Sequence, residues 1–110
     1  MTKPHANAQL VANWTTAPIG VALPELIAER SLSLRRIAAL AEVDPSHLSR
    51  GLRGKGDKQI SGELAGRIAE ALGLPVDYFP EYREMVIVRA VREDPALRDR
   101  LYKRLAAQRD

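Results

Sequence analysis

The feature that most constrains the fold is a pair of helix starts around residues 34–53, LRRIAALAEVDPSHLSRGLR. Ser33 is a good N-cap residue, and the apolar residues after it recur at helical spacing. Glu42-Val43 breaks that pattern. Asp44-Pro45 then begins a second helix, because a capping carboxylate precedes the residue best suited to the first helical position. The sequence therefore predicts two short helices joined by a tight corner, with an inner face formed by Leu34, Ile37, Ala38, Ala41, Leu48 and Leu52.

Composition favours packed helices over a sheet. Of 110 residues, 45% are hydrophobic but only 5% are aromatic, so the core must be built from Leu, Ile, Val and Ala. This length holds one domain, with room for a small appendage. No apolar run approaches the roughly 20 residues that cross a bilayer, and the N-terminus lacks the apolar stretch of a secretion signal. The absence of cysteine excludes disulfides and thiolate zinc sites, and it fits the cytoplasm, where we expect the protein to act.

Further helices are predicted on both sides of this pair. One spans about 21–31, where Pro24 is tolerable only in the first turn. Another spans 62–72, because Ser61 is a suitable N-cap and Gly73 a suitable residue just beyond the C-terminus. Apolar residues at helical spacing give this second helix a stripe that faces the core.

The C-terminal part of the chain continues the helical pattern. Residues 74–79 predict a fifth, short helix that Pro80 ends. A helix is expected over 81–92 because no second strand is available for pairing, although the β-branched run within it is also compatible with a strand. Asp94-Pro95 repeats the cap-plus-proline start and opens a last helix that runs to about Ala107. The apolar row of this last helix is Leu97, Leu101 and Leu105.

The pattern at 34–53 resembles the helix-turn-helix of the Cro and lambda-repressor family, also called the xenobiotic-response-element family. The run 61–79 is similar to the closing helices of the same domain, so the resemblance covers roughly residues 22–82, about half of the chain. The matching positions are Ala38, where the helices approach closely, Val43 and Leu48, which are buried after the turn, and Gly54, which ends the recognition helix.

Two residues depart from the family pattern. Glu42 stands where the family usually has glycine in the turn, and a non-glycine residue at positive φ carries strain. Gly51 stands at a usually bulky inward position, so we expect Leu52 to take over that packing.

The resemblance implies an all-α fold and a regulatory function. The expected architecture is an irregular arm at 1–20, a five-helix lambda-repressor-like DNA-binding domain at 21–80 and a helical C-terminal extension at 81–110. The expected function is a sequence-specific, repressor-like transcriptional regulator that binds double-stranded DNA. Since one short helix touches only a few base pairs, we expect a homodimer on an inverted-repeat operator.

The helix that starts at Pro45 is the predicted recognition helix. Arg50 is the strongest candidate for reading a base, because its guanidinium can span guanine O6 and N7. The alternative for Arg50 is an ion pair with Asp44 or Glu42, and His47 is expected to support the cap or face solvent. The predicted base-contacting residues are Pro45, Ser46, Ser49 and Arg50, and the predicted phosphate-contacting residues are Arg35, Arg36, Arg53, Lys55 and Lys58.

The distribution of charge supports this assignment better than the formal net charge of +3 does. Between residues 50 and 58, four cations stand against Asp57 alone. The positive excess therefore lies on the predicted recognition helix and the loop after it, where a phosphate backbone would pass.

Enzymatic and cofactor-dependent functions find little support. His5 and His47 are isolated and lack metal-ligand spacing, and no serine lies in a nucleophile-elbow motif. The glycine-rich basic loop at 54–58 lacks the spacing of a phosphate-binding loop and has no preceding strand. We therefore expect no catalysis, no metal and no cofactor.

The sequence leaves two possible packing partners for the C-terminal extension. Its leucine row, together with Val88 or Val91, is the preferred dimer surface, and the alternative is that the row packs back on its own domain. The alternatives to DNA-binding regulation are an antitoxin that folds against a toxin and an adaptor of the same fold that has lost DNA binding. Trp14 is expected to plug the domain, although the arm could instead reach DNA through Lys3 and His5.

Overall fold

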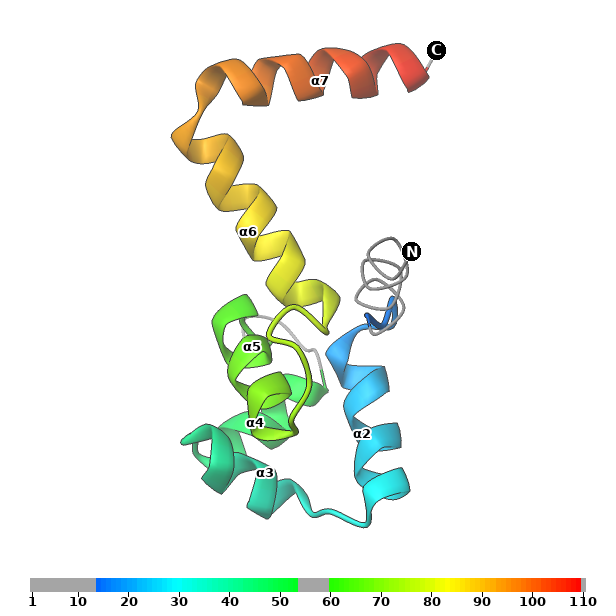
Figure 1. Cartoon of the computed structure of the whole chain (residues 1–110), viewed down its shortest axis with the longest axis vertical. Coiled ribbons are helices and arrows are strands. Elements are labelled where there is room, and N and C mark those ends of the chain that lie inside the picture. Colours follow the sequence, from blue (N-terminus) through cyan, green and yellow to red (C-terminus); the bar gives the residue numbers. More distant parts are fainter. Residues whose placement is uncertain (1–13, 54–59, 110) are drawn as a thin grey trace, which may run out of the picture.

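The computed structural model describes residues 14–53 and 60–109, which form six α-helices and no strand. The all-α expectation is therefore confirmed. Four helices surround the core, and the last two extend away from it (Figure 1). In chain order the helices are α2 (Ile19–Arg30), α3 (Leu34–Ala41), α4 (Pro45–Leu52), α5 (Gly62–Ala71), α6 (Pro80–Glu93) and α7 (Pro95–Arg109).

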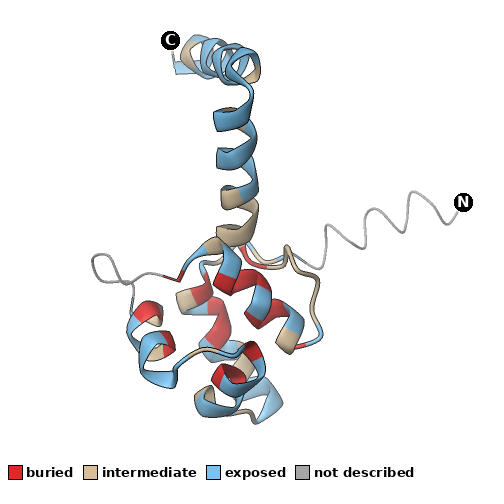
Figure 2. Cartoon of the chain, turned by 90° about the vertical axis from the view of Figure 1, so that its left-hand side faces the viewer, coloured by how far each residue is buried: buried red, intermediate tan, exposed pale blue. Residues whose placement is uncertain are grey.

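The core lies between α2, α3, α4 and α5. Its largest fully buried side chains are Leu23, Ile37, Leu48, Ile68 and Phe79, each with 0% of its surface exposed. Figure 2 shows that buried residues are concentrated in this four-helix part, whereas α7 and the upper part of α6 are largely exposed. Each helix contributes residues at the three- and four-residue spacing that places side chains on one face.

Helix α2 begins at Ile19, two residues earlier than the sequence predicts, and Pro24 therefore lies in its second turn rather than its first. Pro18 at the N-cap supplies no side-chain hydrogen bond. Instead, Glu81 of α6 accepts a hydrogen bond from the Ile19 N–H, with 3.0 Å to Oε2. A carboxylate at this end also complements the helix dipole. The start of α2 is thus stabilised by a residue that is distant in sequence.

The prediction of a fifth helix at 74–79 is wrong. These residues form a turn in which the Tyr78 N–H donates to the Pro75 carbonyl at 3.0 Å, and Phe79 enters the core from its end. Pro80 does not end a helix but begins α6, at the first-turn position that proline favours.

The helix predicted over 81–92 is confirmed as α6, which packs across α5. Two glycines of α5, Gly62 and Gly66, allow α6 to pack closely against α5. A Cβ at Gly62 would lie 2.6 Å from the Met85 Cβ, and one at Gly66 would lie 2.9 Å from the Tyr82 ring. The first turns of α6 are therefore bound to the domain, although the predicted domain boundary falls at residue 80.

The last helix is confirmed as α7, and Asp94 caps it by accepting the Leu97 N–H at 3.1 Å. No described residue of α7 is buried. The chain turns sharply at the end of α6, and α7 runs clear of the four-helix part (Figure 1). The interpretation that its leucine row packs back on the domain is wrong for Leu101 and Leu105, which are 37% and 50% exposed.

Trp14 lies on the domain as expected, but it is a partly exposed contact rather than a buried plug. Trp14 is 38% exposed, and its ring stacks on the Arg83 guanidinium, whose carbon lies 4.6 Å from the ring centroid. Lys3 and His5, the alternative DNA contacts of the arm, lie outside the described residues.

Candidate nucleic-acid interface

The two helix starts seen in the sequence are built as predicted. Ser33 Oγ accepts a hydrogen bond from the Arg36 N–H at 3.1 Å, and Asp44 Oδ1 accepts one from the Ser46 N–H at 2.7 Å. Pro45 occupies the first turn of α4. Because both caps use side chains close to the helix they begin, the bounds of α3 and α4 follow from local sequence.

The corner between α3 and α4 has the strained conformation expected at Glu42. Its backbone is left-handed, with φ 60° and ψ 49°. Arg67 of α5 donates hydrogen bonds to the carbonyl oxygens of Ala41 and Glu42, the latter at 2.8 Å. These carbonyls close a helix end that would otherwise leave acceptors unpaired. Arg67 therefore fixes the corner from 25 residues away, and the sequence carries no local signal for that role.

Replacing Glu42 by glycine is expected to raise the free energy of unfolding by about 0.5–1 kcal/mol. Glycine avoids the Cβ crowding of the left-handed region, and the bonds from Arg67 go to backbone oxygens that the change retains. Urea denaturation measures the effect. Ala39→Gly, on the exposed side of α3, is the matched control and should lower stability by about 1 kcal/mol. A loss of stability in both variants would contradict the conformation assigned to Glu42.

The inward side of α4 shows how the chain accommodates Gly51. Leu48 and Gly51 are buried, and Leu52 is half-buried against the core, as expected from the missing side chain at Gly51. Gly20 of α2 lies close to this end of α4, because an added Cβ there would come within 2.8 Å of the Leu52 carbonyl oxygen. Glycine at position 20 thus permits the backbone of α2 to approach the backbone at the end of α4 closely.

The outward side of α4 carries the predicted base-contacting residues. Pro45, Ser46 and Arg50 are exposed, whereas Ser49 is half-buried and its Oγ accepts a 3.4 Å hydrogen bond from Arg53. His47 is exposed as well.

Arg50 does not form the ion pair that was its alternative role. Within the part of the chain that the structure describes, the ion pairs are Arg89–Glu63 and Arg98–Asp99. The Asp44 carboxylate is instead engaged in capping α4. The guanidinium of Arg50 therefore projects from α4 without an ionic partner among the described residues.

Three of the five predicted phosphate-contacting residues are exposed in the structure. Arg35 and Arg36 lie exposed in the first turn of α3, and Arg53 lies exposed at the C-terminal cap of α4. Lys55 and Lys58 lie outside the described residues.

Metal-binding and membrane-spanning features are absent from the described part of the chain. No group of three or more His, Asp or Glu side chains there could hold a metal ion. None of the helices in residues 14–53 and 60–109 is both long enough and apolar enough to cross a membrane.

Comparison with known proteins identifies the fold family. A helix-turn-helix family model, of the Cro/C1 type, matches residues 25–79, which is half of the chain and includes α3, the corner and α4. Searches of curated proteins and of solved structures found no match. The matched region, the capped pair of short helices and the left-handed corner between them agree: this chain belongs to the helix-turn-helix family, whose domains bind DNA.

Proposed function

We propose that the protein is a sequence-specific, repressor-like transcriptional regulator that binds an inverted-repeat operator as a homodimer. The observation that carries the proposal is the outward face of α4. It is exposed, its one guanidinium has no described ionic partner, and further exposed cations lie in the first turn of α3 and at the C-terminal cap of α4. A helix of this kind fits the major groove, where each base pair presents a distinct pattern of donors and acceptors.

Each exposed side chain of α4 has a distinct role in this proposal. Arg50 donates two hydrogen bonds to guanine O6 and N7. Ser46, in the first turn, donates to or accepts from a base edge, and Pro45 contacts a thymine methyl group, since it has no N–H to donate. Ser49 is half-buried and already bonded to Arg53, so it contacts a base or phosphate only if that 3.4 Å bond yields.

The flanking cations orient α4 without reading sequence. Arg35 and Arg36 face one phosphate strand, but only one of them is optimally placed to bind it, because adjacent side chains point about 100° apart around a helix. Arg53 holds the other strand, together with Lys55 and Lys58. Contacts of this kind supply affinity and register but carry no base information.

A homodimer follows from the small size of one recognition helix. Two-fold pairing places two such helices about 34–36 Å apart, one turn of DNA, and doubles the number of bases read. In this proposal residues 81–110 provide the dimer surface, and residues 21–80 bind DNA.

A partner protein, as for an antitoxin, is the second candidate function. The exposed apolar side chains of α7 are the observation that favours it. Purification of the chain with its genomic neighbour expressed alongside distinguishes the two, because only an antitoxin would recover a second chain in fixed proportion.

Selection from random duplex DNA with the purified protein tests the proposed function. We expect enrichment of an inverted repeat whose half-sites are centred about 10–10.5 base pairs apart. Enrichment of a single unrepeated site would contradict the dimer, and enrichment of nothing would contradict sequence-specific binding and favour an adaptor role.

A further inference from the structure

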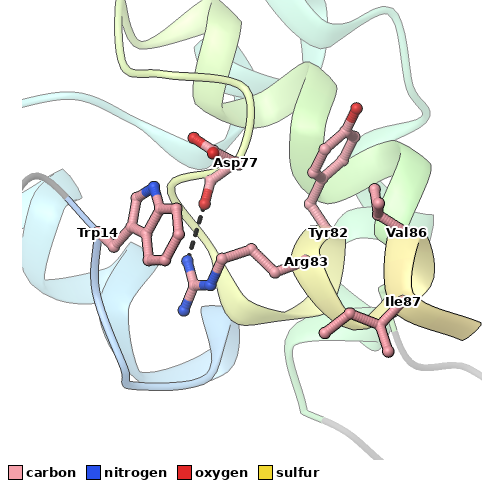
Figure 3. Close-up of a pocket in the computed structure, with 6 residues that line it drawn as sticks. All are labelled: Trp14, Asp77, Tyr82, Arg83, Val86 and Ile87. Carbon is pink, nitrogen blue, oxygen red and sulfur yellow. Dashed lines mark hydrogen bonds between the residues drawn. The ribbon is translucent and has the colours of Figure 1, made fainter. Parts of the chain in front are cut away.

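An apolar groove lies beside α6, on the side where the N-terminal segment meets the domain. Its volume is about 440 Å³, and Figure 3 shows its lining: Trp14, Asp77, Tyr82, Arg83, Val86 and Ile87. The outer walls are strongly exposed, with Trp14 38%, Val86 47% and Ile87 57% accessible. Single exposed apolar residues are common, but a contiguous group with a concave shape indicates a binding surface.

The one cation that lines this groove, Arg83, is already engaged. Arg83 Nη1 donates to the carbonyl oxygens of Asp77 and Tyr78 at 2.8 and 2.9 Å, and Nη2 donates to that of Thr15 at 2.8 Å. The guanidinium also stacks on Trp14 (Figure 3). Arg83 therefore holds the two walls together, and the groove offers apolar surface rather than a free cation.

The same chain contains a helix without a packing surface. Leu101, Leu105 and Tyr102 of α7 are 37%, 50% and 68% exposed, and α7 makes its main contacts with the end of α6. A 15-residue helix is about 22 Å long, and helices of this length are marginal in water unless one face is packed. The leucine row of α7 therefore needs a surface that its own domain does not supply.

The charges identify which surface complements α7. Five cations and one carboxylate lie on α7, so two copies of α7 placed side by side would repel each other. The segment 77–87, which forms most of the groove, carries a small excess of the opposite sign: Asp77 and Glu84 stand against Arg83, while the Glu81 carboxylate is engaged at the start of α2. Helix α7 is thus matched to the groove in both apolar character and charge.

The arrangement of the helices prevents α7 from reaching the groove of its own chain. Helix α7 runs away from α6, and the angle between them opens toward the side where residues 14–18 enter the domain (Figure 1). A second copy related by a two-fold axis can place its α7 in that angle while its own groove receives the first copy's α7. Such an exchange makes every contact twice, which helps to reach the roughly 1,200–2,000 Å² that stable interfaces bury.

We propose that α7 of each copy docks in the groove of the other, with Leu101 and Leu105 against Val86 and Ile87. This inference rests on the proposed homodimer and specifies its contacts. The groove then becomes part of the dimer interface, and Trp14 lies under the partner's helix.

Trp14 provides the measurement, since it is the only tryptophan in the chain. Its fluorescence emission is recorded over a dilution series of the full-length protein, with molar mass followed in parallel by analytical ultracentrifugation. We expect the emission to shift to shorter wavelength as the dimer forms, with the same midpoint as the change in mass.

The test variant is the double substitution Leu101→Asp with Leu105→Asp, and far-UV circular dichroism checks that it folds. It should be monomeric at concentrations where the wild type is dimeric, and its Trp14 emission should not change with concentration. Ala96→Asp with Ala107→Asp is the matched control, because it adds the same charge on the opposite side of α7 at exposed positions. This control should behave like the wild type, whereas Ile87→Asp, in the groove, should reproduce the loss of dimer.

Two results would overturn the inference. A wild-type chain that is monomeric throughout would leave no second copy to occupy the groove. A dimer that forms without any change in Trp14 emission would show that α7 does not cover the groove. Neither result bears on whether α4 binds DNA, which the selection experiment measures separately.

Discussion

Replacing Phe79 with alanine is expected to lower the free energy of unfolding by about 3–5 kcal/mol. Phe79 is the only phenylalanine and is completely buried. Its ring packs edge-on against Tyr78, with centroids 5.1 Å apart and ring planes at 87°. Truncation would leave a cavity between helices drawn from separate parts of the sequence, and such surroundings relax only partly. Because native domains are stable by only about 5–15 kcal/mol, this loss is a large part of the free energy of unfolding.

Urea denaturation of the full chain measures this prediction. Val21→Ala is the control, since Val21 is 54% exposed on α2 and its truncation should change stability by no more than about 0.5 kcal/mol. A loss below 1 kcal/mol for Phe79→Ala would show that the turn at 74–79 does not anchor in the core as described.

The helix pair and much of the core could be predicted because their determinants are local. Ser33, Asp44 and Ser61 each cap the helix that follows them. Within a helix, Pro45 is tolerated only in the first turn. Helical spacing then fixes which side chains face inward. The left-handed corner at Glu42 could also be predicted, since the family pattern places glycine there.

The predictions that are wrong concern segments whose local sequence is compatible with two structures. Proline after an apolar run can end one helix or begin the next, and Pro80 does the second. The missed contacts are those between residues distant in sequence. Glu81 caps α2 across 62 positions, and Arg83 reaches the Thr15 carbonyl across 68. No spacing rule within one helix reveals such partners, so the sequence indicated neither the start of α2 nor the way α6 is tied to the domain.

The outward position of most candidate residues on α4 could be predicted, but the burial of Ser49 could not. Helical spacing assigns Pro45, Ser46 and Arg50 to the outward side, and the structure leaves all three exposed. The same spacing treats Ser49 as equivalent, yet Ser49 is half-buried and bonded to Arg53. Burial of a residue at the edge of a helix face depends on what packs beside it, which a single sequence does not specify.

Replacing Arg50 with alanine is expected to reduce specific operator binding by about 1–3 kcal/mol for each half-site, or roughly 5- to 150-fold. The reason is that this guanidinium is the one group of α4 able to make a bidentate contact with guanine. Arg50 has no ionic partner among the described residues, so its removal breaks no ion pair within the described part of the chain. Non-specific binding should change little, since it depends on the number of phosphate contacts.

Lys55→Ala and Arg53→Ala are the matched controls, because each removes one cation that is predicted to contact a phosphate rather than a base. Both should weaken specific and non-specific binding alike, and each should lower the slope of log affinity against log salt concentration by about one unit. Fluorescence anisotropy with operator and scrambled duplexes, at several salt concentrations, separates the two kinds of effect.

The central claim is that the exposed face of α4 reads bases, and the ratio of operator to scrambled affinity in Arg50→Ala tests it most directly. The account predicts that this ratio falls by at least about 30-fold in Arg50→Ala, from the lower bound of about 1 kcal/mol at each of the two half-sites, while it stays within about twofold of wild type in Lys55→Ala. An unchanged ratio in Arg50→Ala, or an equal fall in both variants, would contradict it.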